Sequence, residues 1–290
     1  MPATNAKKLL VIDGALGTQM IDRGLRMGDC PDLWNLDHPD KLQEIHKNYI
    51  EAGAQVITAN TFGANPIKLS DYGLQDRAEE LNRAAIDIAK SVCPAGVLVA
   101  ADMGPTGKFL PPVGEGSLEE FAESFEIQAE IIKKAGVDLI LIETMYDLRE
   151  ALVCLKAAKK TGIPVYVSMT LDRKKRGFFT IMGDEATVCM KTLEENGADA
   201  AGANCTLDSA GFVELTPLLK KSLTSVPLIV QPNAGQPVIV EGRAIYEETP
   251  EHFERNMKLI IEAGADIIGS CCGSNPEFTR VNAKLAAGRS

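Results

Sequence analysis

Three cysteines have the residue type and the spacing to bind a metal ion. Cys271 and Cys272 are adjacent, and Gly273 frees the backbone to turn directly after them. Adjacent cysteines do not easily form an unstrained disulfide with each other, yet both can reach one metal. Together with Cys205 they offer three soft sulfur ligands, which suit Zn²⁺ and leave a fourth tetrahedral position open. On spacing alone, buried structural cysteines are an equally good interpretation, since the chain has no CxxC motif.

Other polar residues follow short apolar runs in the same way as these cysteines. They are Asp13, Asn60, Asp102, Glu143, Thr170, Asn204 and Asn233. Asp and Asn are common in turns, so no single one of them is informative. A turn or cap residue at Asp13, a buried ion pair at Glu143 and a turn at Asn233 all remain credible. Their chemistry matters only if the fold brings them to one place.

The apolar runs that precede these residues predict eight strands. They are KLLVID (8–13), QVITAN (55–60), VLVAAD (97–102), LILIET (139–144), VYVSMT (165–170), AAGANC (200–205), LIVQPN (228–233) and DIIGSC (266–271). Most are almost continuously apolar, which is typical of parallel strands covered on both faces. Amphipathic helical patterns fill the gaps, for example over 42–53, 118–136 and 249–264.

A pairwise repeat supports this alternation. Every second predicted strand follows AGAQ, AGVD, NGAD or AGAD, in which Gly53, Gly136, Gly197 and Gly264 fit helix C-caps. Four such pairs predict an α/β fold, a single (β/α)₈ TIM-type barrel over 1–290 with its active site at the C-terminal ends of the strands. An open doubly wound sheet is the alternative, but the sequence lacks a glycine-rich dinucleotide fingerprint.

Composition limits the kinds of partner. The formal net charge of -10 argues against nucleic acid as the main partner. The apolar runs are too short for a secretory signal or a membrane helix, so we expect a cytoplasmic location and no membrane partner. Seven cysteines without an export signal favour reduced thiols over disulfides. The four remaining thiols, in helical patterns, near a helix end or in a loop, are left out of the site: Cys30, Cys93, Cys154 and Cys189.

Several motifs carry a family resemblance over nearly the whole chain. They are DGALGT (13–18), ITANTFGAN (57–65), MGPTG (103–107), LILIET (139–144), GANC (202–205), QPNAGQP (231–237) and GSCCG (269–273). With these motifs in this order, the chain resembles the homocysteine S-methyltransferase family. ANTFGAN and PNAG are most similar to the homocysteine-binding module of the cobalamin-dependent members, and betaine-dependent members are near relatives. One departure is Ser270, where the family usually has glycine.

The resemblance implies a role for each predicted site residue. Cys205, Cys271 and Cys272 would be the zinc ligands and the catalytic residues. Asp13 and Glu143 would lie near the amino group of homocysteine, which needs an anion. Backbone N–H groups of the Gly14 to Thr18 turn, including Gly14 and Ala15, would lie near its carboxylate. Asn233 matches a position that supplies an oxygen to zinc in some members when substrate is absent.

The function implied is zinc-dependent transfer of a methyl group to the thiol of homocysteine, forming methionine. The donor would be methylcobalamin on a separate module or corrinoid protein. A betaine- or S-methylmethionine-type enzyme, or one acting on another thiol, is an alternative. A non-catalytic homocysteine-delivering subunit and a metal-independent barrel lyase or isomerase with Glu143 as its base are more distant ones. The basic segment 171–185, with Phe178 and Phe179, is expected to be a solvated loop unless it contacts the donor.

Overall fold

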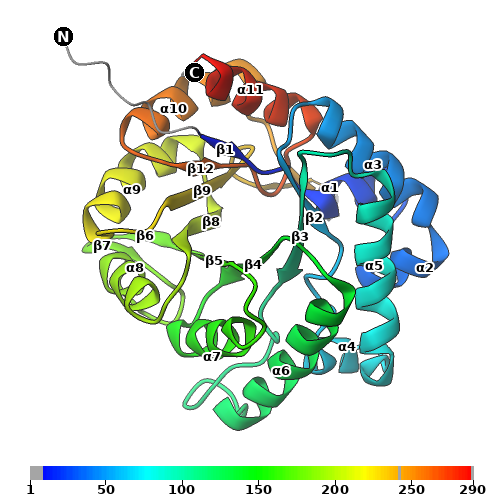
Figure 1. Cartoon of the computed structure of the whole chain (residues 1–290). Helices are drawn as coiled ribbons and strands as arrows, with labels where there is room; N and C mark the ends of the chain where they lie inside the picture. The colour runs from blue at the N-terminus through cyan, green and yellow to red at the C-terminus, as the bar shows by residue number, and fades with distance from the viewer. Residues whose placement is uncertain (1–8, 241–242, 289–290) are drawn as a thin grey trace.

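Eight parallel strands form a barrel, with the helices arranged around it (Figure 1). The computed structural model describes residues 9–240 and 243–288. The strands lie in the order β1-β12-β9-β8-β5-β4-β3-β2. Their bounds are β1 Leu10–Val11, β2 Val56–Ala59, β3 Leu98–Met103, β4 Leu139–Met145, β5 Val165–Met169, β8 Ala200–Asp208, β9 Leu228–Asn233 and β12 Ile267–Ile268. The prediction of eight parallel strands is confirmed.

The barrel closes between β1 and β2. A parallel bridge pairs Ile12 with Val56. The N–H of Asp13 donates to the carbonyl of Val56 at 3.0 Å, and the N–H of Gln55 donates to the carbonyl of Val11 at 2.8 Å. Because the two ends of the strand order meet through these bonds, the open doubly wound sheet is excluded.

Helices cover the outside of the strands. The α-helices are α1 Leu16–Asp22, α2 Trp34–Asp37, α3 Pro39–Glu51, α4 Pro66–Ser70, α5 Ala78–Val92, α6 Leu118–Ala135, α7 Leu148–Lys159, α8 Ala186–Glu195, α9 Ser209–Ser222, α10 Pro250–Glu262 and α11 Pro276–Ala287; the 3₁₀ turns are η1 Pro31–Leu33 and η2 Gln75–Arg77. A capping box of Ser117 and Glu120 starts α6, which satisfies N–H groups that the first turn leaves unpaired. The predicted cap glycines all have positive φ at helix ends, as expected: Gly53 (100°), Gly136 (72°), Gly197 (87°) and Gly264 (108°).

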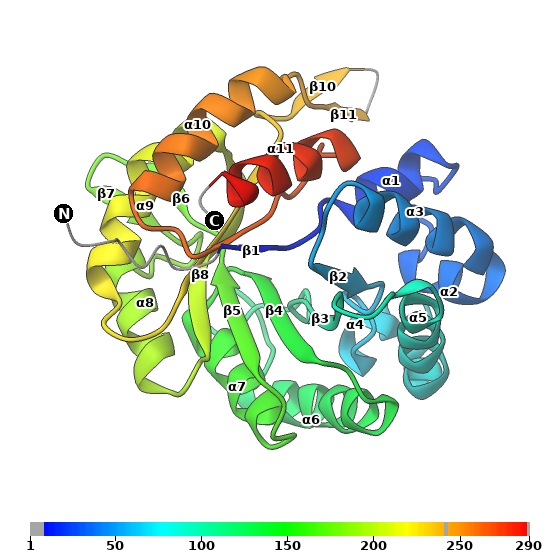
Figure 2. The same ribbon diagram turned by 45° about the horizontal axis from the view of Figure 1, so that its top comes forward.

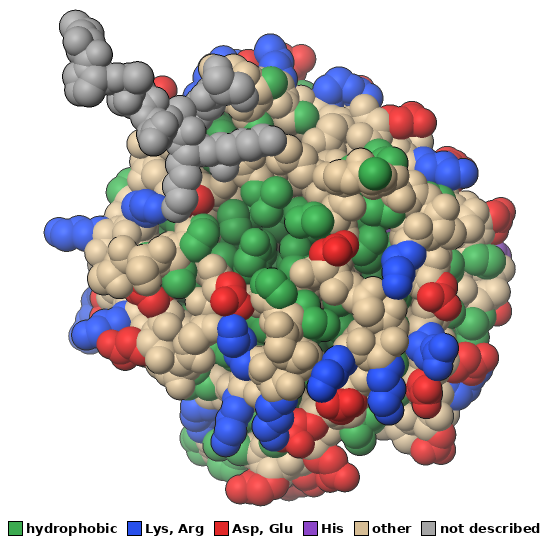
Figure 3. All heavy atoms as spheres, in the orientation of Figure 1, with side chains coloured by type: hydrophobic (Ala, Val, Ile, Leu, Met, Phe, Trp, Pro, Cys, Tyr) green, Lys and Arg blue, Asp and Glu red, His purple; other side chains and the backbone are tan. Residues whose placement is uncertain are grey.

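Two apolar layers hold the barrel together. The larger one lies between the strands and the helices, and a smaller cluster comes from strand residues such as Ile12, Ala100, Leu141 and Ile229. Figure 3 shows the face at which the strands begin, where hydrophobic side chains gather at the centre. Among the described residues, no helix has the length and apolar character needed to cross a membrane.

Two short hairpins extend from the ends of the barrel strands. The pair β6 (Asp172–Lys174) and β7 (Gly177–Phe179) follows β5, and the pair β10 (Val238–Val240) and β11 (Arg243–Ile245) follows β9. Figure 2 shows the second hairpin beyond α10 and α11. The expectation of a solvated loop over 171–185 is therefore correct for its exposed basic residues and wrong for Phe178, which is buried because successive hairpin residues face opposite sides.

Candidate active site

A cavity of about 430 Å³ opens at the C-terminal ends of the strands. Its lining includes most of the residues that the sequence singles out: Asp13, Gly14, Ala15, Glu143, Cys205, Cys271 and Cys272. Asn233, the last residue of β9, is buried behind this lining, where its side chain hydrogen-bonds to the Cys205 thiol. The fold thus brings together residues that are up to 259 positions apart in the chain, such as Ser274 and Ala15.

The three thiols form a compact cluster. Sγ of Cys205 lies 3.8 Å from Sγ of Cys272, which lies 4.0 Å from Sγ of Cys271, and all three sulfurs are within 4.8 Å of one another. A tetrahedral zinc ion with Zn–S bonds of ~2.3 Å separates its sulfurs by about 3.8 Å. The side chains are therefore already spaced for such an ion. They are partly exposed to the cavity, which leaves one side of the cluster accessible.

The backbone at the thiols is unusual. Cys205 and Thr206 have φ of 59° and 60°, a left-handed conformation that is rare outside glycine. The predicted end of this strand at Cys205 is wrong, since β8 continues to Asp208 after a register shift against β9. The Cys271 N–H donates to the carbonyl of Pro232 at 2.8 Å, and the carbonyl of Cys272 accepts from Ala234 at 2.9 Å. Strained backbone conformations such as those of Cys205 and Thr206 are frequent at functional sites.

Hydrogen bonding within the cluster favours one thiolate. Bonds from Cys271 and Cys272 lower the pKa of Cys205 to about 3. Hydrogen bonds with Cys205 and Cys272 raise the pKa of Cys271. The hydrogen bond with Cys205, together with burial, raises the pKa of Cys272 to about 12, although the bond with Cys271 acts against this shift. The protein alone therefore stabilises one negative sulfur, and a divalent cation would compensate the charge of the other two.

Two predicted carboxyl groups face the same cavity. Burial raises the pKa of Asp13 to about 8, although the N–H and hydroxyl of Thr58 both donate to its carboxylate. Burial, and then the charge of Cys205, raise the pKa of Glu143 to about 7, while a weak hydrogen bond from Gln231 (3.4 Å) acts against the shift. A bound ammonium group would favour the ionised form of both.

Two further carboxyl groups line the cavity and were not among the predicted site residues. Asp102 is the penultimate residue of β3, and in the sequence it follows an apolar run just as Asp13 and Glu143 do, which was a usable signal. Asp32 lies in the short 3₁₀ turn η1 between α1 and α2, where no periodic pattern could reveal it. Each has an Oδ1 atom that is buried without a hydrogen-bond partner among the described residues. Burial raises the pKa of Asp102, and raises that of Asp32 to about 6.

The turn after β1 fits its predicted role only in part. The Ala15 N–H donates to the hydroxyl of Ser274 at 3.0 Å, so it is already engaged. The carbonyl of Ala15 accepts from the hydroxyl of Tyr49 at 3.2 Å. The prediction that this turn faces a carboxylate therefore depends on Gly14 and on the first turn of α1, which also line the cavity.

Tyr246 completes the surroundings of the thiols. It follows β11, and its hydroxyl hydrogen-bonds to the Cys272 thiol. Its ring packs directly on Gly273, where an added Cβ would lie 2.1 Å from the ring. Gly273 also has a φ of 79°, so glycine is required there for two independent reasons. No motif in the sequence pointed to Tyr246.

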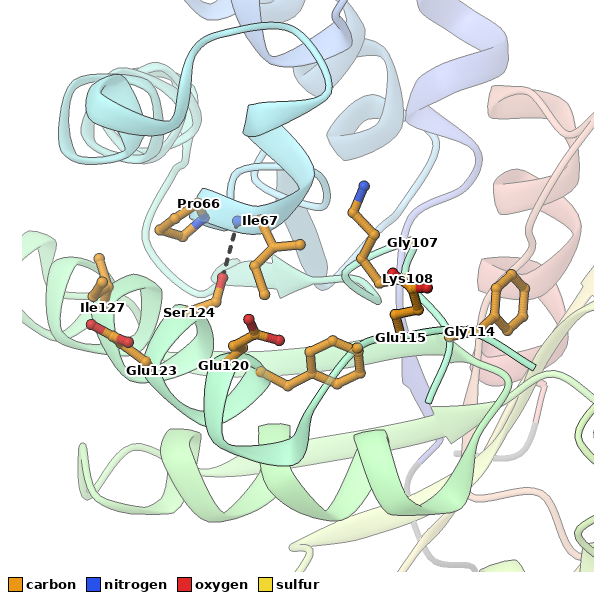
Figure 4. A pocket seen from close by; sticks show the side chains of 13 residues that line it. Pro66, Ile67, Gly107, Lys108, Gly114, Glu115, Glu120, Glu123, Ser124 and Ile127 are labelled. Atoms are coloured by element: carbon orange, nitrogen blue, oxygen red, sulfur yellow. Dashed lines mark hydrogen bonds between the residues drawn. The ribbon is translucent and has the colours of Figure 1, made fainter. Parts of the chain in front are cut away.

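A second hollow, of about 670 Å³, lies between α4, α6 and the loop after β3 (Figure 4). The residues around it include Pro66, Lys108, Glu120 and Ser124, whose hydroxyl accepts from the N–H of Ile67 at 3.2 Å. It contains no thiol and none of the predicted site residues. We therefore assign the chemistry to the smaller cavity.

Comparison with known proteins agrees with this geometry. The sequence pattern of the homocysteine S-methyltransferase family matches residues 10–285. The chain belongs to this family. Within the family, it is 30% identical to methionine synthase of Mycobacterium leprae, over 98% of this chain and 25% of that protein. It is 31% identical to methionine synthase of Mycobacterium tuberculosis, over 97% of this chain and 25% of that protein.

The chain thus spans about a quarter of the length of these relatives. Among solved structures, the metallated form of the homocysteine methyltransferase MmuM from Escherichia coli superposes with a TM-score of 0.75, 24% identity and 96% coverage of both chains. At this identity the likeness shows the fold alone.

Proposed function

We propose that this protein transfers a methyl group to the thiol of homocysteine, forming methionine, in a zinc-dependent reaction. The observation that carries the proposal is the spacing of Cys205, Cys271 and Cys272, which suits a tetrahedral ion in the cavity that also holds Asp13 and Glu143. Zinc bound there would supply a Lewis acid that keeps the incoming thiol deprotonated at neutral pH.

The carboxyl groups support an amino acid as the substrate. Asp13 and Glu143 offer acceptors for an ammonium group, and Gly14 with the start of α1 offers N–H groups for a carboxylate. Asn233, behind Cys205, would supply an oxygen to the metal before the substrate arrives, and its Oδ1 atom has no hydrogen-bond partner among the described residues. In the transfer, the sulfur lone pair forms the S–CH₃ bond, and the donor keeps the electron pair of the bond that breaks.

The methyl donor is proposed to be methylcobalamin on a separate module or corrinoid protein. The relatives are about four times as long as this chain, which leaves room in them for donor modules. Large apolar side chains are exposed on four segments that each connect two barrel strands: Met27, Val113, Ile181 and Ile239. An apolar rim of exposed side chains of this kind suits contact with a partner protein.

The isolated protein with free methylcobalamin and homocysteine tests the proposal. We expect methionine from the zinc-loaded protein and none from protein stripped of zinc by a chelator, as measured by mass spectrometry. The variant Cys205→Ala serves as a site control. Methionine formed equally by stripped and loaded protein would refute the role of zinc, and its absence in every arm would refute this donor.

A further inference from the structure

Asn204 precedes Cys205 and has a fully buried side chain in which every hydrogen-bonding position is used. Its amide oxygen accepts from the backbone N–H of Thr144 at 2.8 Å and from the hydroxyl of Ser168 at 2.8 Å. Its amide nitrogen donates to Oγ1 of Thr144 at 2.8 Å and to Sγ of Cys271 at 3.7 Å. An amide has two acceptor and two donor positions, so none is left over. The bond from the Thr144 N–H also fixes which end of the amide is the oxygen.

These bonds connect parts of the barrel that are not adjacent. Ser168 and Thr144 belong to β5 and β4, which lie next to β8 in that order, and Cys271 follows β12 on the other side. Thr144 has a φ of 63°, and the register between β4 and β5 shifts between Ile142 and Met145. A β-branched residue holds such a conformation only where its surroundings impose it. Asn204 makes two hydrogen bonds to Thr144 that help to impose this conformation.

The two ends of this network carry different chemistry. Cys271 is one of the three thiols, and Thr144 directly follows Glu143, the carboxylate proposed to bind the substrate ammonium group. A shift of the Asn204 side chain would therefore change the separation between the sulfur cluster and that carboxylate. An amino-acid thiol has a fixed number of carbon atoms between its sulfur and its nitrogen, so this separation decides which one fits.

We propose that Asn204 is a positioning residue that sets the spacing between the three-thiol site and Glu143, and so selects homocysteine over cysteine, which is one methylene shorter. This inference rests on the proposed function. It assigns to Asn204 no contact with the substrate. It predicts that variants of Asn204 alter metal binding and substrate selection together, because one amide serves both.

Four variants test this role. Asn204→Asp keeps the shape and the acceptor oxygen but loses the N–H donors to Cys271 and Thr144. Thr144→Val loses only the hydroxyl at the far end of the network, and Thr144→Ser keeps it. Ser168→Ala is the matched control, because it removes a bond to the same amide without touching Cys271 or Thr144. Zinc affinity is read by competition with a chromophoric chelator, the affinities for homocysteine and cysteine by calorimetry on zinc-loaded protein, and the fold by circular dichroism.

We expect Asn204→Asp to lower zinc affinity about ten- to hundredfold, as is usual when a residue that orients a ligand is changed. The preference for homocysteine over cysteine should fall about tenfold, in keeping with the partial loss of one hydrogen bond to a charged group. Thr144→Val should lower the preference while zinc affinity stays within about threefold, and Thr144→Ser should restore it. Ser168→Ala should leave both quantities within about twofold.

Unchanged zinc affinity and preference in a folded Asn204→Asp protein would overturn the proposal. Loss of zinc with an unchanged preference would overturn it as well, because Asn204 would then support the metal site alone. If Asn204→Asp does not fold, the contrast between Thr144→Val and Thr144→Ser decides. A wild-type protein that binds neither zinc nor homocysteine would instead refute the proposed function, and this measurement comes first.

Discussion

Glu143 lies on the same cavity as the thiols, but its proposed task concerns only substrates that carry an ammonium group. The variant Glu143→Gln should weaken homocysteine binding by roughly ten- to a hundredfold, the worth of a hydrogen bond to a charged group. Mercaptoethanol meets the same thiol cluster without an ammonium group and should be affected far less. Rates with both thiols and the same methyl donor measure this difference. Equal losses would show that Glu143 supports the metal site or acts as a general base.

The thiol cluster makes a prediction about metal content. Cys205→Ala, Cys271→Ala and Cys272→Ala should each reduce bound zinc from about one ion per chain to a small fraction, because two sulfurs no longer define a tetrahedral site. The fold should persist, since the three thiols lie outside the apolar layers of the barrel. Elemental analysis and circular dichroism measure the two effects. Full zinc content in Cys205→Ala would place the metal elsewhere.

Asp13 links the cavity to the pH dependence of stability. Burial raises its pKa to about 8 in the folded protein, from an ordinary value of 3.8. The folded state therefore keeps a proton that the unfolded chain releases above about pH 4, so the free energy of unfolding should fall as the pH rises from about 4 to about 8. Asp13→Asn cannot ionise and keeps an acceptor for Thr58.

In Asp13→Asn, the free energy of unfolding should therefore fall less between these pH values, by an amount on the order of a few kcal/mol. Urea unfolding of both proteins at pH 5 and pH 8, without substrate, measures it. An identical slope in both proteins would mean that the Asp13 carboxyl is ionised in the folded state at neutral pH.

At the scale of elements, the loop after β12 depends on contact with the segment after β11. Gly273→Ala places a methyl group 2.1 Å from the Tyr246 ring at a residue with a φ of 79°. We expect the affinity for zinc to fall at least tenfold while the barrel stays folded, because the loop must move away from Cys205. Gly24→Ala is a control with positive φ (111°) and open space around the added carbon. Similar zinc affinity in the two variants would show that the ring contact does not position the thiols.

Sequence patterns predicted the elements better than the contacts between them. The strands before Asp102 and Glu143 were evident, because continuous apolar runs bounded by polar residues are typical of parallel barrel strands. Strand ends were also the reason that Cys205 and Cys271 could be placed together. The continuation of β8 past Cys205 was not predictable, since Cys205 and Thr206 adopt positive φ that their residue types disfavour.

The roles of Asp32, Tyr246 and Asn204 depend on tertiary contacts. Asp32 lies in the 3₁₀ turn η1 and lines the cavity, whereas Tyr246 follows β11 and contacts Cys272, and neither position shows a periodic pattern in the sequence. Asn204 was visible as a strand end, but its four bonds join β8, β5, β4 and the thiol loop. Such a network follows from the curvature of the closed sheet, which a single sequence does not specify in detail.

At the scale of the molecule, the apolar rim predicts how the donor approaches. Ile181, after β7, is 75% exposed, and Ile239, on β10, is 69% exposed. The double variant Ile181→Asp/Ile239→Asp should slow methyl transfer from a corrinoid protein by about tenfold or more, because charges would have to be buried against the partner. Transfer from free methylcobalamin should be unchanged, since neither side chain lines the cavity. Equal slowing with both donors would mean that the rim affects the site itself.

The short strands at the barrel closure have a consequence for motion. Next to the closure between β1 and β2, β1 pairs with β12 and β12 pairs with β9 through two residue pairs each, whereas β2 and β3 pair through four. Cys271 and Cys272 follow β12, and Cys205 lies on β8 across β9. An ion shared by these thiols would tie the sparsely bonded strands to the well-bonded ones. Amide hydrogens of Leu10, Ile12 and Gly269 should then exchange with deuterium more slowly in zinc-loaded than in zinc-free protein, while those of β3 and β4 keep their rates.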